Sequence, residues 1–381
     1  MIYDMVIIGG GIKGLCTLYH SLRLGCRSVA LVEQFQIGHQ KGSSHGQSRI
    51  TRSSYVSPVY VRLMHRVHSE EWPRLEADTG VRLLHSTPGC IWGPAGGKVQ
   101  KYAKSVLQAG ISVEQIDVRT ARRRFPMFHF TNDDLILDDT TCALIDAQAT
   151  IKSLARICVE KGADLLENET VVELNLKRDP IQVKTNRGVL MTNRLAITAG
   201  PWSSQLLPEL SRRLSVTNQC VGYFELVGEP NQFQVGQFPV WIYLGLGNNN
   251  TFYGLPQFGH EGIKIARHVT TGQTADLDSG TRSSDLAILD LRQFLNRYFQ
   301  HSIQRFCQVE YCLYTNTETE DYLIDFYPEK SNVVVGAGFS GHGFKLAPLT
   351  GKIIAELLIC QKTTVPEFEA KSSREIFKWV R

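Results

Sequence analysis

The chain has 381 residues, of which 43% are hydrophobic and 20% are charged, and its 41 basic and 37 acidic residues leave a formal net charge of +4. This length predicts two or three domains, and the composition is that of a globular protein rather than a disordered one. The net charge is small and no long basic run exists, so we expect no nucleic-acid partner. No apolar run approaches the length of about 18 residues that a membrane span requires, so we expect no membrane segment.

The N-terminus and the cysteines narrow the class of protein further. No basic region precedes the apolar residues at the start of the chain, and a glycine loop begins at Gly9. Cleavage of a signal peptide would destroy that loop, so the chain is expected to stay inside the cell. The nine cysteines are scattered and form no Cys-x-x-Cys pair, which predicts neither a zinc site nor a disulfide framework.

The first 33 residues have the pattern of a βαβ unit. Residues 3–8 form a short apolar run typical of a buried strand, residues 12–24 have the pattern of a helix, and residues 28–33 form a second apolar run. Glycines lie between the first strand and the helix. This arrangement predicts that a parallel sheet begins at the N-terminus.

A helix is predicted to begin at Ser57, which suits the cap position because Pro58 follows at the first turn. This helix should run to about Gly80, with a kink or interruption at Pro73 because proline lacks the backbone N–H. Further strands are predicted at residues 194–199, 221–227, 240–243, 262–266 and 332–337, and further helices at residues 284–299 and 348–361.

These elements predict an α/β protein in which a Rossmann-type domain is built from discontinuous segments. We expect residues 1–85, 145–212 and 305–381 to form this nucleotide-binding domain. The remaining segments, 86–144 and 213–304, are expected to form a β-rich α+β domain that binds the substrate.

Residues 9–14 match the dinucleotide-binding motif G-x-G-x-x-G through Gly9, Gly11 and Gly14. The motif follows a strand and opens a helix, and Glu33 ends the next strand about 20 residues later. The glycines allow a pyrophosphate to approach the helix N-terminus, and Glu33 can accept hydrogen bonds from a ribose while repelling a 2′-phosphate. The motif therefore predicts NAD or FAD rather than NADP, and does not by itself separate these two.

A second glycine-rich segment favours a flavin. Residues 336–345, with the sequence GAGFSGHGFK, follow a predicted strand and precede a predicted helix. Gly338, Gly341 and Gly343 would let a cofactor laid across the sheet reach this loop with its far end. The alternative for this segment is an ordinary turn.

Four stretches carry a resemblance to a known family: GSSHGQSRITR at 42–52, ITAGPW at 197–202, YCLYTN at 311–316 and GAGFSGHGFKLAP at 336–348. With the N-terminal motif they span nearly the whole chain. The chain resembles the monomeric sarcosine oxidase family, within the D-amino-acid-oxidase-like flavoproteins. It is most similar to the animal peroxisomal branch, called sarcosine oxidase or L-pipecolate oxidase.

The resemblance implies that FAD is the cofactor and that a cysteine thioether attaches it to the protein. Cys312 matches the flavin-linking cysteine, in the pattern Cys312-Leu313-Tyr314. Because a thiolate must attack the 8-methyl group of the flavin, we expect a basic neighbourhood that lowers the pKa of this cysteine.

The resemblance also assigns the groups that bind the substrate and the flavin. Arg52 and Lys345 match the pair that holds the substrate carboxylate, the first as a planar fork and the second as a point charge. His45 and Arg49 match positions beside the flavin ring. Two more positions in the matching stretches, Ser44 and Gly200, are expected to contact the cofactor.

Lys264 matches the lysine that the family uses for oxygen activation, where a fixed cation stabilises the superoxide formed by the first electron transfer. His268 matches an active-site histidine that binds the substrate or takes a proton from its ammonium group. Tyr253 and Tyr314 match aromatic residues that line the pocket, and the alternative for both is packing in the core.

The sequence therefore predicts an FAD-dependent oxidase of small secondary amino acids of the sarcosine, L-pipecolate or L-proline type. The substrate is oxidised to an imine that water hydrolyses, and oxygen takes the electrons and gives hydrogen peroxide. We expect a monomer whose partners are the amino acid and oxygen. Two alternatives stay open: an amino-acid dehydrogenase of the same fold that uses an electron carrier, and a flavin-binding protein without catalytic activity.

The resemblance implies a peroxisomal location. Residues 378–381, however, read KWVR, which is not a C-terminal peroxisomal tripeptide of the S-K-L kind. The cytoplasm is therefore the other location that we expect.

Overall fold

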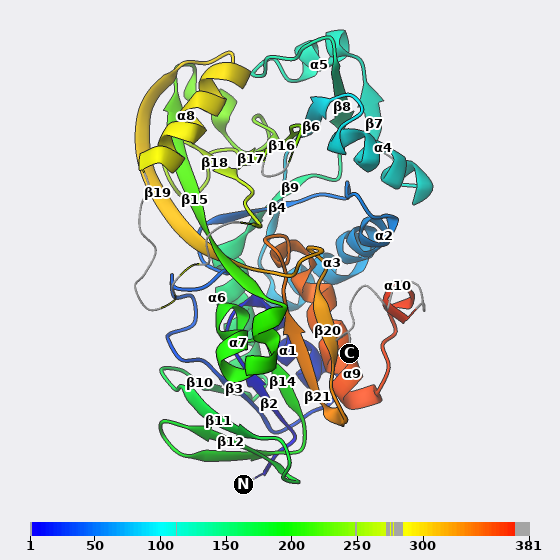
Figure 1. The fold of residues 1–381 in the computed structure, drawn as a ribbon, viewed down its shortest axis with the longest axis vertical. Helices are drawn as coiled ribbons and strands as arrows, with labels where there is room; N and C mark the ends of the chain where they lie inside the picture. Colours follow the sequence, from blue (N-terminus) through cyan, green and yellow to red (C-terminus); the bar gives the residue numbers. More distant parts are fainter. Residues whose placement is uncertain are drawn as a thin grey trace.

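The computed structural model describes residues 2–111, 113–247, 250–271, 275, 277 and 285–369. The molecule is elongated, with one large β-sheet in each half and a group of short strands and helices between them (Figure 1). The predicted α/β architecture is confirmed. None of the helices in the described part of the chain has the length and apolar character that crossing a membrane requires.

The half that contains the N-terminus is built on a six-stranded sheet, which is parallel except at one edge. Helices pack against one face, and a four-stranded sheet and the segment that follows β14 pack against the other. Because both faces are covered, the inner strands are continuous apolar runs. In sheet order the strands are β10 (Asp164–Leu166), β3 (Val29–Val32), β2 (Met5–Ile8), β14 (Leu195–Ile197), β21 (Lys330–Ala337) and β20 (Leu323–Tyr327).

The helices on the first face are α1 (Ile12–Arg23), α6 (Ala147–Glu160) and α9 (Ala347–Cys360). α1 packs against both of the others, so the beginning, the middle and the end of the described chain share one core. The small sheet on the opposite face has the order β1 (Ile2–Tyr3), β13 (Val189–Thr192), β12 (Ile181–Thr185) and β11 (Val171–Asn175).

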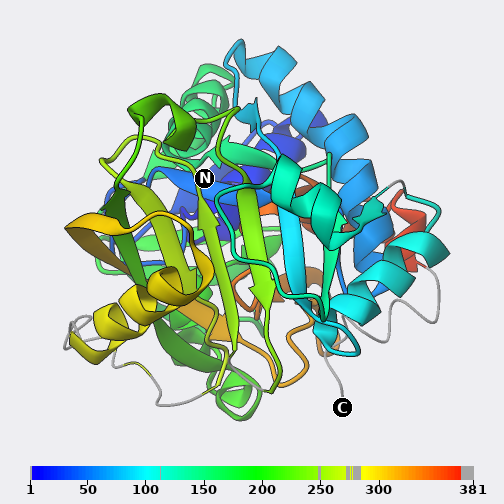
Figure 2. The ribbon, with the colours of Figure 1, turned by 90° about the horizontal axis from the view of Figure 1, so that it is seen from above.

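The other half is built on an eight-stranded sheet, which Figure 2 shows from above with helix α8 across one face. An aromatic core lies between α8 and the sheet, where the rings of Trp241 and Phe294 stack at an interplanar angle of 3°. In sheet order the strands are β19 (Ile303–Asn316), β15 (Ser215–Leu226), β18 (Ile263–Arg267), β17 (Thr251–Leu255), β16 (Val240–Leu244), β6 (Gly89–Pro94), β8 (Asp134–Asp138) and β7 (Glu114–Ile116). The helices of this half are α4 (Lys98–Gln108), α5 (Val118–Arg124) and α8 (Asp285–Tyr298).

Between the halves, the helix predicted from Ser57 begins as expected, since the side chain of Ser57 accepts a hydrogen bond from the backbone N–H of Val59. The predicted interruption is a π-helical segment that ends just before Pro73, where the missing N–H of proline breaks the α-helical pattern. The elements of this region are α2 (Pro58–Arg66), the π-helix η1 (Val67–Glu71), α3 (Trp72–Thr79) and a three-stranded sheet of β4 (Ser48–Thr51), β9 (Ala143–Asp146) and β5 (Leu84–Ser86).

Short helices complete the described chain: η2 (Gly200–Trp202), α7 (Ser203–Leu206), η3 (Pro208–Arg212), η4 (Pro230–Phe233), η5 (Phe344–Leu346) and α10 (Pro366–Glu369). The division of the chain into domains at residues 85, 144, 212 and 304 stays a prediction. β19, which carries Cys312, pairs with β15 from Ser215 to Leu226 and is thus part of the eight-stranded sheet.

Candidate active site

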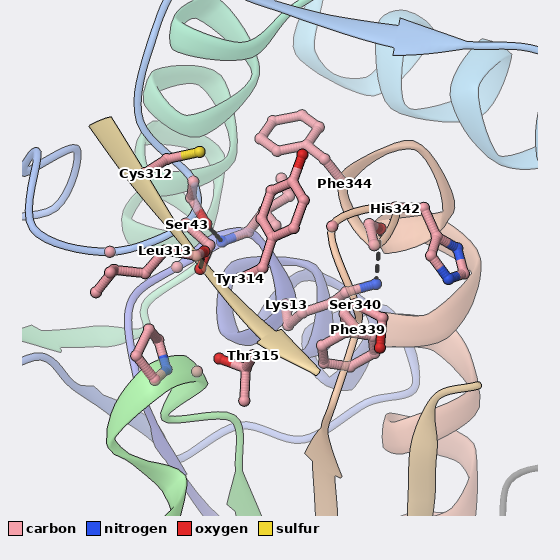
Figure 3. Close-up of a pocket in the computed structure, with 18 of the residues that line it drawn as sticks. Lys13, Ser43, Cys312, Leu313, Tyr314, Thr315, Phe339, Ser340, His342 and Phe344 are labelled. Carbon is pink, nitrogen blue, oxygen red and sulfur yellow. Dashed lines mark hydrogen bonds between the residues drawn. The ribbon is translucent and has the colours of Figure 1, made fainter. Parts of the chain in front are cut away.

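A cavity of about 960 Å³ is lined by residues from both halves of the molecule. It extends from the glycine loop before α1, past β4, β18 and β19, to the second glycine-rich loop between β21 and η5. Figure 3 shows the part of it where Tyr314 of β19 lies beside the loop that carries Ser340 and His342, with Cys312 farther along the same strand. All of the predicted site residues line this cavity except Gly14.

At the α1 end of the cavity, Glu33 is buried and its carboxylate holds the loops around it. Its Oε2 accepts a hydrogen bond from the backbone N–H of Gly10 at 2.7 Å, and its Oε1 accepts one from the backbone N–H of Phe35 at 2.9 Å. Gly14 has a structural role instead: a Cβ there would lie 1.8 Å from the carbonyl oxygen of Gly9. Only glycine therefore lets α1 approach the strand so closely.

The segment that precedes β4 crosses the middle of the cavity. The hydroxyl of Ser44 accepts a hydrogen bond from the backbone N–H of Ile12 at 3.0 Å, which ties this segment to the start of α1. Arg49 donates from Nη1 to the carbonyl of Ser48 at 2.9 Å. His45 is mostly buried, burial lowers its pKa to about 4, and its Nε2 has no hydrogen-bond partner among the described residues. The imidazole is therefore neutral near neutral pH.

Cys312 is buried on β19 and faces the cavity. The positive charges of Arg49 and Lys264 act on its thiol, as the sequence predicts. The expected lowering of the pKa of Cys312 was wrong, however, because burial raises this pKa by more than the two cations lower it. Burial disfavours the charged thiolate in the same way that it disfavours other ions.

Lys264 lies on β18 and only 4% of its surface is exposed. Its Nζ donates a hydrogen bond to the carbonyl of Ser48 at 2.9 Å. Burial, with the nearby charge of Arg49, lowers the pKa of Lys264 to about 7. The burial of Lys264 therefore excludes the ordinary interpretation, in which this lysine lies on the solvent face of an alternating strand.

Arg52 is 6% exposed, and its guanidinium lies 4.4 Å from the ring centre of Tyr55. Its Nη2 donates to the hydroxyl of Tyr102 at 3.3 Å. The other two nitrogens, Nε and Nη1, are buried without a hydrogen-bond partner among the described residues. A buried guanidinium with two free donors can bind a planar anion.

Lys345 lies next to Arg52 and shares its aromatic partner. Its Nζ donates to the hydroxyl of Tyr55 at 3.0 Å, and burial together with the charge of Arg52 lowers the pKa of this lysine well below its ordinary value. Because burial and the charge of Arg52 both disfavour the charged lysine, an anion that binds here would relieve the repulsion and favour the charged form.

Tyr253, Tyr314 and His268 also line the cavity. The hydroxyls of Tyr253, on β17, and Tyr314, on β19, are hydrogen-bonded at 3.0 Å. The ring of His268 lies 5.5 Å from that of Tyr314, and its Nε2 is 3.8 Å from the Oε2 of Glu320. The cavity therefore contains a hydrogen-bonded pair of tyrosines and a contact between a histidine and a carboxylate.

The second glycine-rich loop bends sharply beneath Tyr314. Gly341 has a φ of +73°, and a Cβ there would lie 2.2 Å from the ring of Tyr314. Gly338, Gly343 and Gly200 also line the cavity, as predicted. The glycine at 341 is therefore required both by the backbone conformation and by the close approach of the tyrosine.

A family model described as FAD dependent oxidoreductase matches residues 4–357 of the chain. The chain belongs to this family. Among its relatives, peroxisomal sarcosine oxidase of Mus musculus is 34% identical over 366 residues, which cover 93% of this chain and 92% of that protein. Monomeric sarcosine oxidase of Bacillus sp. (strain B-0618) is 28% identical over 371 residues, which cover 95% of this chain and 93% of that protein.

Solved structures show the same fold at lower identity. NikD, an unusual amino acid oxidase essential for nikkomycin biosynthesis, superposes with a TM-score of 0.80 at 23% identity and covers 95% of both chains. L-proline dehydrogenase from P. horikoshii superposes with a TM-score of 0.80 at 20% identity and covers 98% of both chains. The predicted resemblance to the sarcosine oxidases is confirmed by the relatives above.

The cavity of this FAD-dependent oxidoreductase fits its cofactor. The backbone at the start of α1 and the carboxylate of Glu33 would hold the adenosine and pyrophosphate end. Towards the other end, the free Nε2 of His45 and the cations Arg49 and Lys264 suit the polar edge of a flavin ring. No group of His, Cys, Asp and Glu side chains in the described ranges has the arrangement of a metal site.

Several residues of the site were missed in the sequence. Lys13 is buried, and its Nζ donates to the carbonyl of Gly343 at 2.8 Å and to the hydroxyl of Thr350 at 2.7 Å, which joins the two glycine-rich loops (Figure 3). Tyr55 was also missed, although it contacts both Arg52 and Lys345. Lys13 occupies a variable position of the G-x-G-x-x-G motif, so no pattern distinguished it from a solvated lysine.

Proposed function

We propose that the protein is an FAD-dependent oxidase of small secondary amino acids of the sarcosine, L-pipecolate or L-proline type, with oxygen as the electron acceptor. The names of the relatives support this proposal, since both proteins described above are sarcosine oxidases. When bound, FAD supplies the redox chemistry by accepting two electrons from the substrate and passing them on. The residues of the chain bind the substrate, orient it and move its protons.

The observation that carries the proposal is the buried guanidinium of Arg52. Its Nε and Nη1 lack partners within the described residues, although burying unsatisfied donors is costly. Together with the Nζ of Lys345, they form a clamp that fits a carboxylate. A carboxylate on this clamp would place the rest of a small amino acid in the same cavity as Tyr253, Tyr314 and His268.

The amine must be uncharged before it can be oxidised, and His268 is the group in the cavity that would accept its proton. Histidine suits this role because its ordinary pKa lies near neutral pH. Once the substrate is an imine, water completes its hydrolysis.

We propose that Lys264 serves the step in which oxygen becomes hydrogen peroxide. A lysine ammonium stabilises negative charge that develops on oxygen, and a buried cation does so more strongly than a solvated one. The pKa of about 7 means that Lys264 is charged in a substantial fraction of molecules at neutral pH.

We also propose that Cys312 forms a thioether with the 8-methyl carbon of the flavin. This bond replaces one S–H and one C–H bond, so its formation releases two protons and two electrons, and oxygen can take the electrons. The buried position of Cys312 at the cavity wall, between the charges of Arg49 and Lys264, supports the proposal. Although burial raises the pKa of the thiol, both cations favour the thiolate.

The two relatives also support a monomer that works in the peroxisome, since one is named monomeric and the other peroxisomal. We propose both properties for this protein. Sedimentation of the holoprotein tests the first, and fractionation of cells that express the full chain tests the second.

Anaerobic mixing with a panel of amino acids tests the activity. Sarcosine, L-pipecolate and L-proline should bleach the flavin absorbance, and glycine serves as the control with a primary amine. A flavin that none of these compounds bleaches would contradict the proposal and favour the non-catalytic flavin-binding protein.

A further inference from the structure

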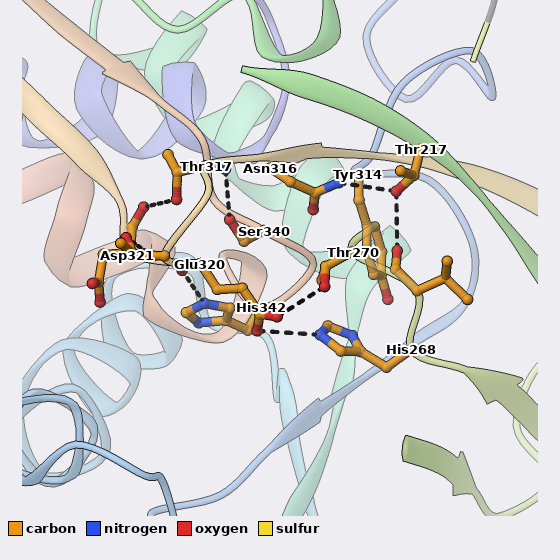
Figure 4. A network of polar contacts seen from close by, with 12 residues as sticks. Thr217, His268, Thr270, Tyr314, Asn316, Thr317, Glu320, Asp321, Ser340 and His342 are labelled. Carbon is orange, nitrogen blue, oxygen red and sulfur yellow. Dashed lines mark hydrogen bonds and ion pairs between the residues drawn. The ribbon is translucent and has the colours of Figure 1, made fainter. Parts of the chain in front are cut away.

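The turn between β19 and β20 carries a carboxylate that the proposed mechanism does not use. Glu320 lines the same cavity as His268, and its Oε2 is 3.8 Å from the Nε2 of that histidine (Figure 4). Its Oε1 accepts a hydrogen bond from the hydroxyl of Thr270 at 2.8 Å. Two elements that are far apart in the sequence are thus brought together by one carboxylate.

The backbone of Glu320 is also held in place. Its φ is +64°, in the left-handed region that residues with a side chain rarely occupy. Its carbonyl oxygen accepts a hydrogen bond from the Nε2 of His342 at 2.9 Å. Such a conformation persists only where the surrounding contacts enforce it.

His342 connects this turn to the carboxylate clamp. Its Nδ1 accepts a hydrogen bond from the hydroxyl of Tyr322 at 2.8 Å, and its carbonyl accepts one from the Nζ of Lys345 at 3.4 Å. Lys345 also donates to Tyr55, against which Arg52 packs. The groups that would bind the carboxylate and the groups near the amine are therefore held by one continuous network.

We propose that Glu320 is the positioning residue of a His268–Glu320 pair that takes the proton from the substrate ammonium and releases it to solvent. This inference rests on the proposed function. In the first step an N–H bond of the ammonium breaks and an N–H bond forms on the imidazole. The carboxylate stabilises the resulting imidazolium, and water removes the proton.

The orientation of the pair agrees with this order of events. If the Nε2–H of His268 faces the carboxylate, the lone pair of the neutral ring is on Nδ1, where it can accept a proton. The side chain of Glu320 is 47% exposed and that of His268 is 22% exposed, so the pair extends from the cavity towards water. A proton can therefore leave without crossing the carboxylate clamp.

Among the ionisable groups around His268, Glu320 is the one that can stabilise a charged imidazolium. The contact with His268 lowers the pKa of Glu320 to about 2, so the carboxylate is ionised throughout the working range. Burial, with the charge of Lys345, lowers the pKa of His342, and burial raises that of Tyr314, so both rings stay neutral. In the same turn, burial raises the pKa of Asp321.

The holoprotein carrying Glu320→Gln tests the inference, with anaerobic reduction of the flavin measured across pH. In the wild type the rate should rise with pH to a plateau, because the amine is oxidised only after it has lost its proton. Removing the carboxylate should slow the plateau about tenfold, because no negative charge then stabilises the imidazolium that forms. Glu318→Gln, in the same turn and also at the cavity wall, should match the wild type.

The double variant of Glu320→Gln and His268→Asn separates a role through His268 from a general structural effect. If Glu320 acts through the histidine, the double variant should be no slower than His268→Asn alone. Additive losses, or a plateau rate of Glu320→Gln equal to that of the wild type, would overturn the inference.

If Glu320→Gln fails to retain flavin, Thr270→Val provides the test, because it keeps the charge and removes one hydrogen bond to the carboxylate. It should slow reduction about 2- to 10-fold and depend on His268 in the same way. An unchanged rate would then count against the inference. A wild-type flavin that no amino acid reduces would contradict the proposed function instead, so the two failures are distinguishable.

Discussion

Replacing Arg52 with alanine is expected to weaken the binding of carboxylates about 150-fold. Nε and Nη1 are both buried without partners among the described residues, so a carboxylate can gain two charge-assisted hydrogen bonds. At about 1.5 kcal/mol for each bond, their loss costs about 3 kcal/mol, which corresponds to that factor in the dissociation constant. We use the lower value for each bond because the Nζ of Lys345 remains in the variant.

The assay is titration of the holoprotein with acetate, which carries the carboxylate without the amine, followed through the flavin spectrum. Tyr102→Phe is the matched control, since it removes only the 3.3 Å hydrogen bond to Nη2 and should change the affinity by less than about threefold. The KM for an amino-acid substrate should rise in parallel with the acetate dissociation constant in Arg52→Ala. An acetate affinity equal to that of the wild type would refute the assignment of the clamp.

Three further outcomes follow from the cavity. Acid-precipitated wild-type protein should stay yellow, whereas Cys312→Ser should release the colour to the supernatant, and a colourless wild-type pellet would show that no thioether forms. Lys264→Met should leave anaerobic reduction nearly unchanged and slow reoxidation by oxygen about 10²- to 10³-fold, because negative charge develops on oxygen only in that step. Equal slowing of both half-reactions in stopped-flow measurements would remove Lys264 from the oxygen step. Since burial lowers the pKa of Lys264 from 10.5 to about 7, the unfolded chain binds more protons in this range, and the free energy of unfolding should rise with pH by up to about 1.4 kcal/mol per unit. Denaturation of the apoprotein on the alkaline side of neutrality should show a slope in Lys264→Met that is shallower than that of the wild type by up to this amount.

The parts of the fold that sequence patterns could predict are those in which the signal is local. The βαβ unit was correct because a buried parallel strand is a continuous apolar run and a glycine loop follows it. Helix α9 was predicted at residues 348–361 and runs from Ala347 to Cys360. Helix α8, predicted at residues 284–299, is described from Asp285 to Tyr298.

The contacts between distant loops could not be predicted from local patterns. Glu320 follows a strand as an ordinary polar turn residue, and only the folded chain brings it next to His268 and Thr270. Tyr55 lies in a loop without any periodic signal, yet both cations of the clamp pack against it. The site residues that were predicted came from motifs of the family rather than from hydrophobic periodicity.

The predicted direction of the pKa shift of Cys312 was wrong for a related reason. A sequence shows which cations lie near a thiol only where a motif places them together, and it does not show how deeply the thiol is buried. Burial in this structure outweighs the charges of Arg49 and Lys264. The sign of such a shift depends on solvent exposure, which the fold determines.

The most direct test of the central claim is the fate of the electrons once a secondary amino acid has reduced the flavin. The reduced holoprotein is mixed with air-saturated buffer, and flavin reoxidation and hydrogen peroxide are measured together. The proposed oxidase should reoxidise rapidly and form one hydrogen peroxide for each imine. Slow reoxidation in air, with fast reoxidation by an artificial electron carrier, would contradict it and establish an amino-acid dehydrogenase instead.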